Sequence, residues 1–171
     1  VHAAPGHDPH SVVLFEPQRR LLISADALWE RGFGVVFPEL EGEQAFAEVE
    51  ATLDVIEQLQ PEWVLPGHGG MFSDVAGALT VARKRLADFQ ADPQRHAQYA
   101  AKVLLKYKLL EWQQASCQQV QDWCASTPLM QQMRQRYFAD QDPAAWVLAL
   151  LQALAAARAV VWEGDQVRNV D

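Results

Sequence analysis

Cysteine is scarce in this chain, which excludes a fold held together by a disulfide framework. Only Cys117 and Cys124 occur among the 171 residues, and they do not form a CxxC pair. They lie seven positions apart in a segment whose pattern is helical. We therefore expect two reduced thiols packed in or near a core.

Positive charge is also in short supply. The chain has 14 Lys and Arg against 22 Asp and Glu, which gives a formal net charge of −8. Such a balance provides no general attraction to phosphate backbones, so a nucleic acid would have to be held by a local basic patch. We interpret the short basic cluster at 83–85 as a solvated helix face, with a contact to an anionic substrate as the alternative.

Long apolar runs and a charged-then-apolar leader are absent from the sequence as well. No run approaches the roughly 20 residues that a membrane-crossing helix needs. We therefore expect a cytoplasmic protein that makes no membrane contact. Because the chain opens at Val1 and enters a dense turn motif within a few residues, we also expect it to be part of a longer protein.

The first 70 residues have the pattern of an α/β fold. Two apolar runs, Val12–Phe15 and Leu21–Ala25, predict strands joined by the polar turn Glu16–Arg20, and runs of this kind suit strands buried on both faces. From Glu43 to Gln60 the apolar spacing changes to that of a helix. Trp63–Leu65 then predicts a further strand that runs into a glycine-rich loop.

The remainder of the chain reads as helices followed by a hairpin. Asp74 can cap one helix, and the pairs Asp92–Pro93 and Asp142–Pro143 are typical of helix starts. Residues 159–170 predict a β-hairpin with its turn at Gly164.

These signals predict two domains, residues 1–80 and residues 81–171. The second is expected to be a helical, winged-helix-like lobe, and the change of character lies between residues 73 and 92.

Three polar residues stand where predicted strands begin or end. His7 precedes the first strand, Asp26 follows the second and His68 follows the third. Imidazole and carboxylate are preferred ligands of zinc and similar ions, and glycine beside each histidine permits close backbone approach. Singly, each is more typical of a loop residue or a helix cap, but their shared position at strand ends predicts a common metal site.

The segments around these residues resemble the third, fourth and fifth metal-binding motifs of the metallo-β-lactamase superfamily. The motifs appear in the family's order, and within the superfamily they are similar to glyoxalase II-like and β-lactamase-like-2-like hydrolases. The matching segments are Ala4–His7 with Asp8–Leu14, then Ser24–Leu28, then Leu65–Gly69. The resemblance implies the C-terminal half of an αββα sandwich followed by the winged-helix-like lobe.

The resemblance also implies a role for each residue. His7 would bind a first metal ion, Asp26 would bridge both ions and serve as the catalytic residue, and His68 would bind the second ion. The implied cofactor is a pair of divalent ions, with zinc as the expected metal. His10 would contact substrate or support His7, although a surface turn histidine is an equally good interpretation.

One part of the family's pattern has no counterpart here. The HxHxDH motif is absent, and His2, His10 and His96 are the only other histidines. Each metal would therefore keep two protein ligands, whereas a zinc site normally has at least three. We expect this chain alone to bind metal weakly or not at all, to be inactive, and to pair with a missing N-terminal half or a second copy.

The intact protein is therefore expected to be a metal-dependent hydrolase that acts on an ester, thioester, amide or phosphodiester through a metal-bound hydroxide. Two alternatives belong to other classes. One is a winged-helix-like module that binds nucleic acid or protein, and the other is a non-catalytic remnant in which the ligand residues are only loop polars.

Overall fold

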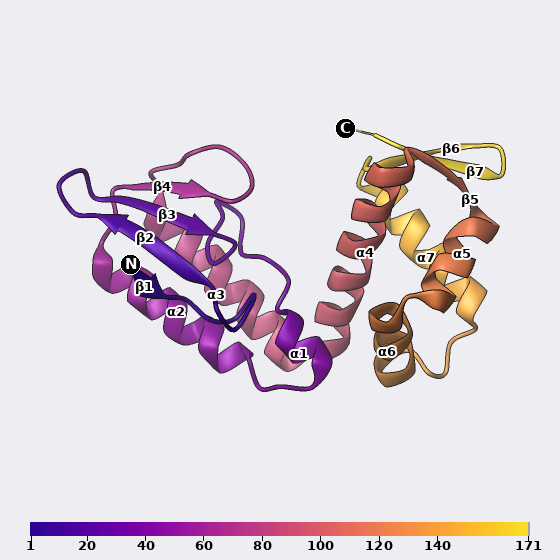
Figure 1. Cartoon of the computed structure of the whole chain (residues 1–171), viewed down its shortest axis with the longest axis horizontal. Coiled ribbons are helices and arrows are strands. Elements are labelled where there is room, and N and C mark those ends of the chain that lie inside the picture. Colours follow the sequence, from indigo (N-terminus) through magenta and orange to yellow (C-terminus); the bar gives the residue numbers. More distant parts are fainter. Residues whose placement is uncertain (171) are drawn as a thin grey trace. The chain divides into compact units, whose positions relative to one another are not determined.

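The computed structural model describes residues 1–170, which form two compact units, Val1–Asp92 and a second that begins at Pro93 (Figure 1). The predicted boundary at residues 80 and 81 instead falls inside helix α3 (Val75–Ala91). The end of α3 stays with the first unit because Phe89 lies edge-on to Phe33, at 6.2 Å, and stacks on Phe46, at 6.5 Å between ring centroids.

The first unit is built on a four-stranded sheet with the order β1-β2-β3-β4. β1 pairs with β2 and β2 with β3 in antiparallel fashion, whereas β3 and β4 are parallel. The two-residue β1 and the short α1 lacked the length for a periodic signal, and the sequence did not predict them. The elements besides α3 are β1 (His2–Ala3), β2 (Val12–Glu16), β3 (Leu21–Ala25), α1 (Phe37–Glu41), α2 (Phe46–Leu59) and β4 (Trp63–Pro66).

One face of this sheet is buried and the other is exposed. Val13, Leu22 and Val64 are fully buried, and α2 and α3 lie together on one side of the sheet (Figure 1). The alternate side chains point the opposite way, and their exposed fractions are 40–46% at Val12, Leu14, Ile23, Trp63 and Leu65. The prediction of strands buried on both faces is therefore met on one face only within residues 1–170.

The second unit combines four helices with a three-stranded sheet of order β5-β7-β6. Its hairpin turns at Gly164, which has a φ of 66°, and thus confirms the predicted turn. Among residues 1–170, no helix is long and apolar enough to cross a membrane. The elements are α4 (Pro93–Trp112), β5 (Gln114–Ser116), α5 (Cys117–Ser126), α6 (Pro128–Tyr137), α7 (Pro143–Ala156), β6 (Val160–Glu163) and β7 (Gln166–Asn169).

Candidate metal centre

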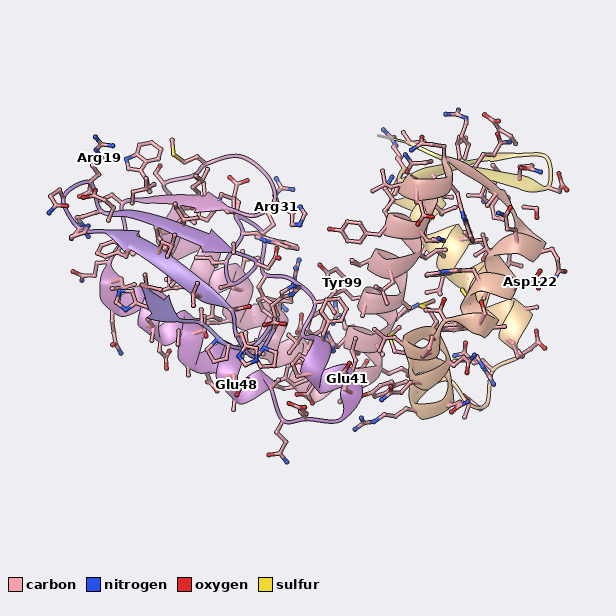
Figure 2. The ribbon with its side chains drawn as sticks, viewed as in Figure 1. Arg19, Arg31, Glu41, Glu48, Tyr99 and Asp122 are labelled. Atoms are coloured by element: carbon pink, nitrogen blue, oxygen red, sulfur yellow. The ribbon has the colours of Figure 1, made fainter. Side chains whose placement is uncertain are left out.

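The strand directions in the first unit bring the three predicted ligands to one edge of the sheet. Because β3 and β4 are parallel, the residues that follow them, Asp26 and His68, emerge at the same edge. Because β2 is antiparallel to β3, the segment that leads into β2 and carries His7 starts there as well. Arg19, in the turn between β2 and β3, marks the opposite end of these strands (Figure 2).

The backbone turns sharply at the end of β3 and thereby presents Asp26. Ala25 has a φ of 47°, a left-handed conformation that costs a non-glycine residue about 1 kcal/mol or more. The Ser24 hydroxyl donates to the Leu28 carbonyl oxygen at 2.6 Å, and the Gly34 N–H donates to the Asp26 carbonyl oxygen at 2.9 Å. These bonds hold the turn in its unfavourable conformation.

The position of His7 is fixed by the packing of its turn on α2 and by the contacts of its ring. Gly6 has a φ of 136°, and a Cβ there would lie 2.6 Å from Val49 Cγ2, so only glycine allows the turn to pack on α2. The ring of His7 lies edge-on to Phe37, at 5.3 Å between centroids, and its Nδ1 is 2.6 Å from the Val35 carbonyl oxygen. Since a carbonyl oxygen only accepts, Nδ1 carries a proton, and in the neutral ring the lone pair is at Nε2.

The two histidines approach different oxygens of the same carboxylate. His7 Nε2 lies 3.5 Å from Asp26 Oδ2, and His68 Nε2 lies 3.7 Å from Asp26 Oδ1. Two zinc ligands in a tetrahedral site are about 3.3 Å apart, because zinc binds nitrogen and oxygen at about 2.0–2.2 Å. Both distances are close to that value, so the donors fit one ion on each side of Asp26.

Two glycines leave the room that this arrangement needs. A Cβ at Gly34 would lie 2.8 Å from His7 Nδ1 and 2.9 Å from Asp26 Cβ. A Cβ at Gly67 would lie 3.2 Å from Asp26 Oδ1. A side chain at either position would displace a ligand, so the glycines permit the close approach of His7, Asp26 and the loop of His68.

Trp29 is a member of this site that the sequence did not predict. Its indole N–H lies 3.2 Å from both Asp26 Oδ1 and the Ala25 carbonyl oxygen, and its ring lies edge-on to His68 at 5.1 Å between centroids. The only sequence signal was its spacing, three residues after Asp26 in the same turn. A donor that fixes the carboxylate of a predicted ligand is typical of the groups that orient metal ligands.

The three predicted ligands would by themselves complete the coordination of neither ion. Within residues 1–170, no cluster of three or more His, Cys, Asp or Glu side chains is arranged to hold a single ion. This agrees with the geometry, because each side of Asp26 offers one histidine nitrogen and one carboxylate oxygen. The residues present fit a part of a two-metal site, and metal binding by them stays a prediction.

The site is open to solvent. The side chains of His7, Asp26 and His68 are 27%, 29% and 55% exposed, and the space enclosed behind His7 and Asp26 is about 10 Å³. That volume is at the limit of what one water molecule needs, about 10–15 Å³, so these residues alone form no substrate cleft.

His10 is exposed, and its backbone N–H donates to Asp8 Oδ1 at 2.8 Å. No hydrogen bond or ion pair in the described chain joins its ring to His7, Asp26 or His68. Its contact with substrate stays a prediction.

Comparison with known protein families finds a match within the first unit. Residues 1–68 match the family model of the metallo-beta-lactamase superfamily. The predicted resemblance to this superfamily is therefore confirmed over these residues. The glyoxalase II-like subgroup stays a prediction.

Two solved structures are among those similar to the chain. One is a metallo-beta-lactamase family protein from Thermus thermophilus, with 19% identity, a TM-score of 0.41, and coverage of 98% of this chain and 48% of its own. Another is a beta-lactamase domain protein from Burkholderia ambifaria, with 21% identity, a TM-score of 0.43, and coverage of 98% and 46%. This chain spans about half the length of these proteins. No curated protein matches it.

Proposed function

We propose that this chain forms part of a metal-dependent hydrolase in which His7, Asp26 and His68 hold two divalent ions, with zinc as the expected metal. The observation that carries the proposal is the approach of two imidazole Nε2 atoms to opposite oxygens of Asp26, at 3.5 and 3.7 Å. When bound, such a pair of ions makes hydroxide available near neutral pH and polarises the oxygen of the scissile group.

The chain's own residues prepare the ligands for this task. The Val35 carbonyl fixes the proton of His7 on Nδ1, which leaves Nε2 free to bind. The Trp29 indole holds Asp26 Oδ1, and its ring limits the positions of His68. We propose an ester, thioester, amide or phosphodiester as substrate, by likeness to the glyoxalase II-like and β-lactamase-like-2-like hydrolases, with His10 at its edge.

The exposed apolar face of the first sheet supports the proposal that a further layer of polypeptide packs on it. Five apolar side chains, each at least 40% exposed, cover the same face of three neighbouring strands. A bare face of several hundred Å² is unfavourable by several kcal/mol at about 25 cal/mol per Å². We propose that polypeptide outside these 171 residues, an N-terminal half or a second copy, covers this face and supplies the further ligands.

Zinc titration by calorimetry tests the metal site directly. The chain is expected to bind zinc weakly, because each ion finds two protein ligands, and His7→Ala, Asp26→Ala and His68→Ala should each weaken binding further. His2→Ala, a histidine substitution on β1, is the matched control and should leave binding unchanged. Zinc binding that is unaffected by Asp26→Ala would contradict the proposal.

A second candidate function rests on the order of elements in the second unit. A helix, a strand, three helices and a terminal hairpin are similar to a winged-helix module, which could bind nucleic acid or protein. Residues 93–171 carry eight Lys and Arg against seven Asp and Glu, and α7 carries neither Lys nor Arg. This even balance favours a protein over a nucleic acid as partner, and a gel-shift assay with duplex DNA and single-stranded RNA separates the two.

A further inference from the structure

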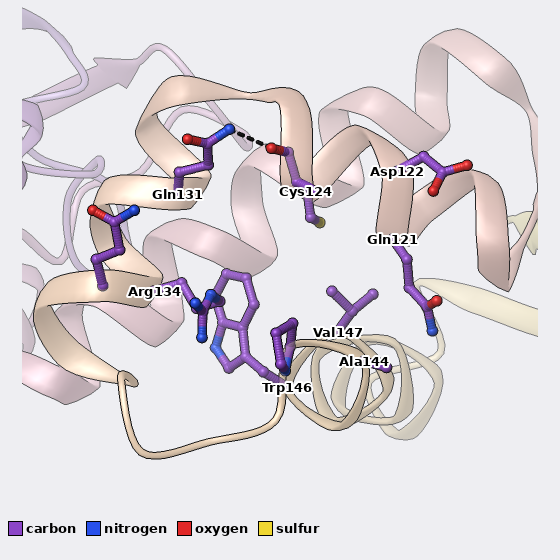
Figure 3. Close-up of a pocket in the computed structure, with 11 residues that line it drawn as sticks. Gln121, Asp122, Cys124, Gln131, Arg134, Ala144, Trp146 and Val147 are labelled. Atoms are coloured by element: carbon purple, nitrogen blue, oxygen red, sulfur yellow. Dashed lines mark hydrogen bonds between the residues drawn. The ribbon is translucent and has the colours of Figure 1, made fainter.

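Each unit has an arginine that lies against an enclosed part of the chain. In the second unit, Arg134 lines a cavity of about 430 Å³ among α5, α6 and α7 (Figure 3). Asp122 and three glutamines share that lining, so its charges favour no class of ligand. In the first unit, Arg85 on α3 contacts the backbone that follows Asp26, and this contact bears on the candidate metal centre.

The backbone after Asp26 makes a tight turn over residues 29–32. The Trp29 N–H donates to the Gly32 carbonyl oxygen at 2.6 Å, and the two residues form an isolated antiparallel bridge. Glu30 and Arg31 are exposed at the tip of the turn, which Arg31 marks in Figure 2. The chain then becomes buried at Gly32 and stays buried through Phe33 and Gly34.

The guanidinium of Arg85 packs on the buried base of this turn. Its Nη1 donates to the Phe33 carbonyl oxygen at 3.3 Å. A Cβ at Gly32 would lie 2.4 Å from Arg85 Cζ, so the guanidinium occupies the space that a side chain at this position would need. Gly32 also has a φ of 122°, which favours glycine. The turn and the arginine therefore fit each other closely.

Both ends of the segment 29–34 contact Asp26. At one end, the Trp29 indole N–H lies 3.2 Å from Asp26 Oδ1. At the other end, the Gly34 N–H donates to the Asp26 carbonyl oxygen at 2.9 Å. A group that fixes the middle of this segment, as Arg85 does at Gly32 and Phe33, therefore also restricts the two contacts that hold Asp26.

The neighbours of Arg85 on α3 make contacts of a different kind. Arg83 pairs with Asp54 and Glu57 on α2, each at 2.8 Å, and Lys84 pairs with Asp88 one turn further along α3, at 3.1 Å. Both are ion pairs between helices or within one helix. Arg85 departs from the solvated helix face predicted for residues 83–85, because its guanidinium lies against the loop that carries the site.

We propose that Arg85 is a positioning residue for the candidate metal centre. Through Gly32 and Phe33 it holds the segment 29–34 in the conformation that keeps the Trp29 indole on Asp26 Oδ1. The consequence for metal binding rests on the proposed function, whereas the effect on Trp29 is a property of the chain before any metal binds.

The first test follows the Trp29 indole N–H signal of the whole chain by two-dimensional ¹H–¹⁵N NMR in the presence of EDTA. Trp29→Phe identifies the signal by removing it. Arg85→Gln should move the signal towards the position of a solvent-exposed indole, because the bond to Asp26 Oδ1 is weakened. Arg83→Gln is the matched control, at a residue two positions earlier that pairs with α2, and should leave the signal in place.

Calorimetric titration with zinc gives the second readout. Arg85→Gln should weaken zinc binding by about threefold or more, since groups that orient metal ligands affect affinity without touching the ion. In a Trp29→Phe background the same substitution should have a smaller effect, because its route to Asp26 Oδ1 is already broken.

A Trp29 signal that Arg85→Gln leaves in place, or that Arg83→Gln moves equally, would overturn the proposal. Additive effects of Arg85→Gln and Trp29→Phe on zinc affinity would overturn it as well. If the unaltered chain binds no zinc, the proposed metal site fails, and the Trp29 signal still decides whether Arg85 holds the segment 29–34.

Discussion

At the scale of single residues, the candidate metal centre depends on groups that would not themselves bind an ion. Val35 orients His7 through a carbonyl oxygen, and Trp29 donates to the carboxylate that the two histidines share. Gly34 and Gly67 are required because they have no side chain, since a Cβ at either position would press on His7 or Asp26. A site can therefore fail through residues that carry no ligand atom.

We predict that Trp29→Phe weakens zinc binding by about tenfold, because it removes the donor to Asp26 Oδ1 and keeps a ring against His68. The measurement is calorimetric titration with zinc. Trp63→Phe, on the exposed face of β4, is the control and should bind zinc as the unaltered chain does. An unchanged affinity in Trp29→Phe would show that the indole only fills space.

His96 should make the second unit sensitive to acid. The residue is 1% exposed, and burial lowers its pKa from 6.5 to about 4. Between these pH values the unfolded chain binds a proton that the folded chain does not. The free energy of unfolding should therefore fall as the pH drops from about 6.5 towards 4, by up to about 3 kcal/mol.

Urea unfolding followed by tryptophan fluorescence at pH 7 and pH 5 measures this loss. His96→Leu should flatten the pH dependence over this range, whatever its effect on stability at pH 7. His10→Gln, at an exposed histidine, should leave the slope as it is. A slope that survives in His96→Leu would assign the acid sensitivity to another group.

At the scale of elements, helix starts follow local chemistry closely. Asp74 accepts from the Gly77 N–H at 3.0 Å, and Asp142 accepts from the Ala145 N–H at 2.9 Å, as their positions in the sequence predicted. Helix α2 ends at Leu59, and its C-cap residue Gln60 takes a left-handed φ of 48° before Pro61. The pairing of the strands does not follow from local chemistry, because their partners lie far away in the chain.

We predict that Asp142→Ala lowers the free energy of unfolding by about 1 kcal/mol, since it removes the side-chain cap of α7. Chemical denaturation at neutral pH gives the measurement. Asp140→Ala, an exposed acid two residues earlier that does not cap α7, should change stability by less than about 0.5 kcal/mol. Equal effects of the two substitutions would attribute the loss to charge rather than to capping.

At the scale of the whole molecule, the main unfavourable feature is the apolar surface that the first unit exposes to solvent on one face of its sheet. Leu14, Ile23, Trp63 and Leu65 are exposed side by side on paired strands, where apolar side chains normally pack against another layer. The candidate metal site lies at the ends of these same strands. Covering the face and completing the site are therefore expected to occur together.

We predict that the purified chain self-associates at micromolar concentration, and that the pair Leu14→Lys and Leu65→Lys reduces association at least about tenfold, because like charges then occupy the face. Sedimentation velocity provides the measurement. Val81→Lys on α3, at a residue with a similar 43% exposure, is the control and should associate as the unaltered chain does. A chain that remains monomeric at high concentration would argue against the proposed partner layer.

The sequence by itself determined the local elements and the identity of the three candidate ligands. Strand, helix and turn signals depend on neighbours a few residues away, which is why β2, β3, β4, α2, the caps and the terminal hairpin were predictable. The motifs around His7, Asp26 and His68 also indicated the superfamily, which the match over residues 1–68 confirms.

Only the tertiary structure decided how those residues meet. The parallel pairing of β3 with β4 sets the edge at which Asp26 and His68 emerge, and it joins residues more than 40 positions apart. The approach of the two histidines to opposite oxygens, the indole of Trp29 and the contact of Arg85 with Gly32 all depend on such distant contacts. No local pattern encodes them, because they arise from packing between elements that are separate in the sequence.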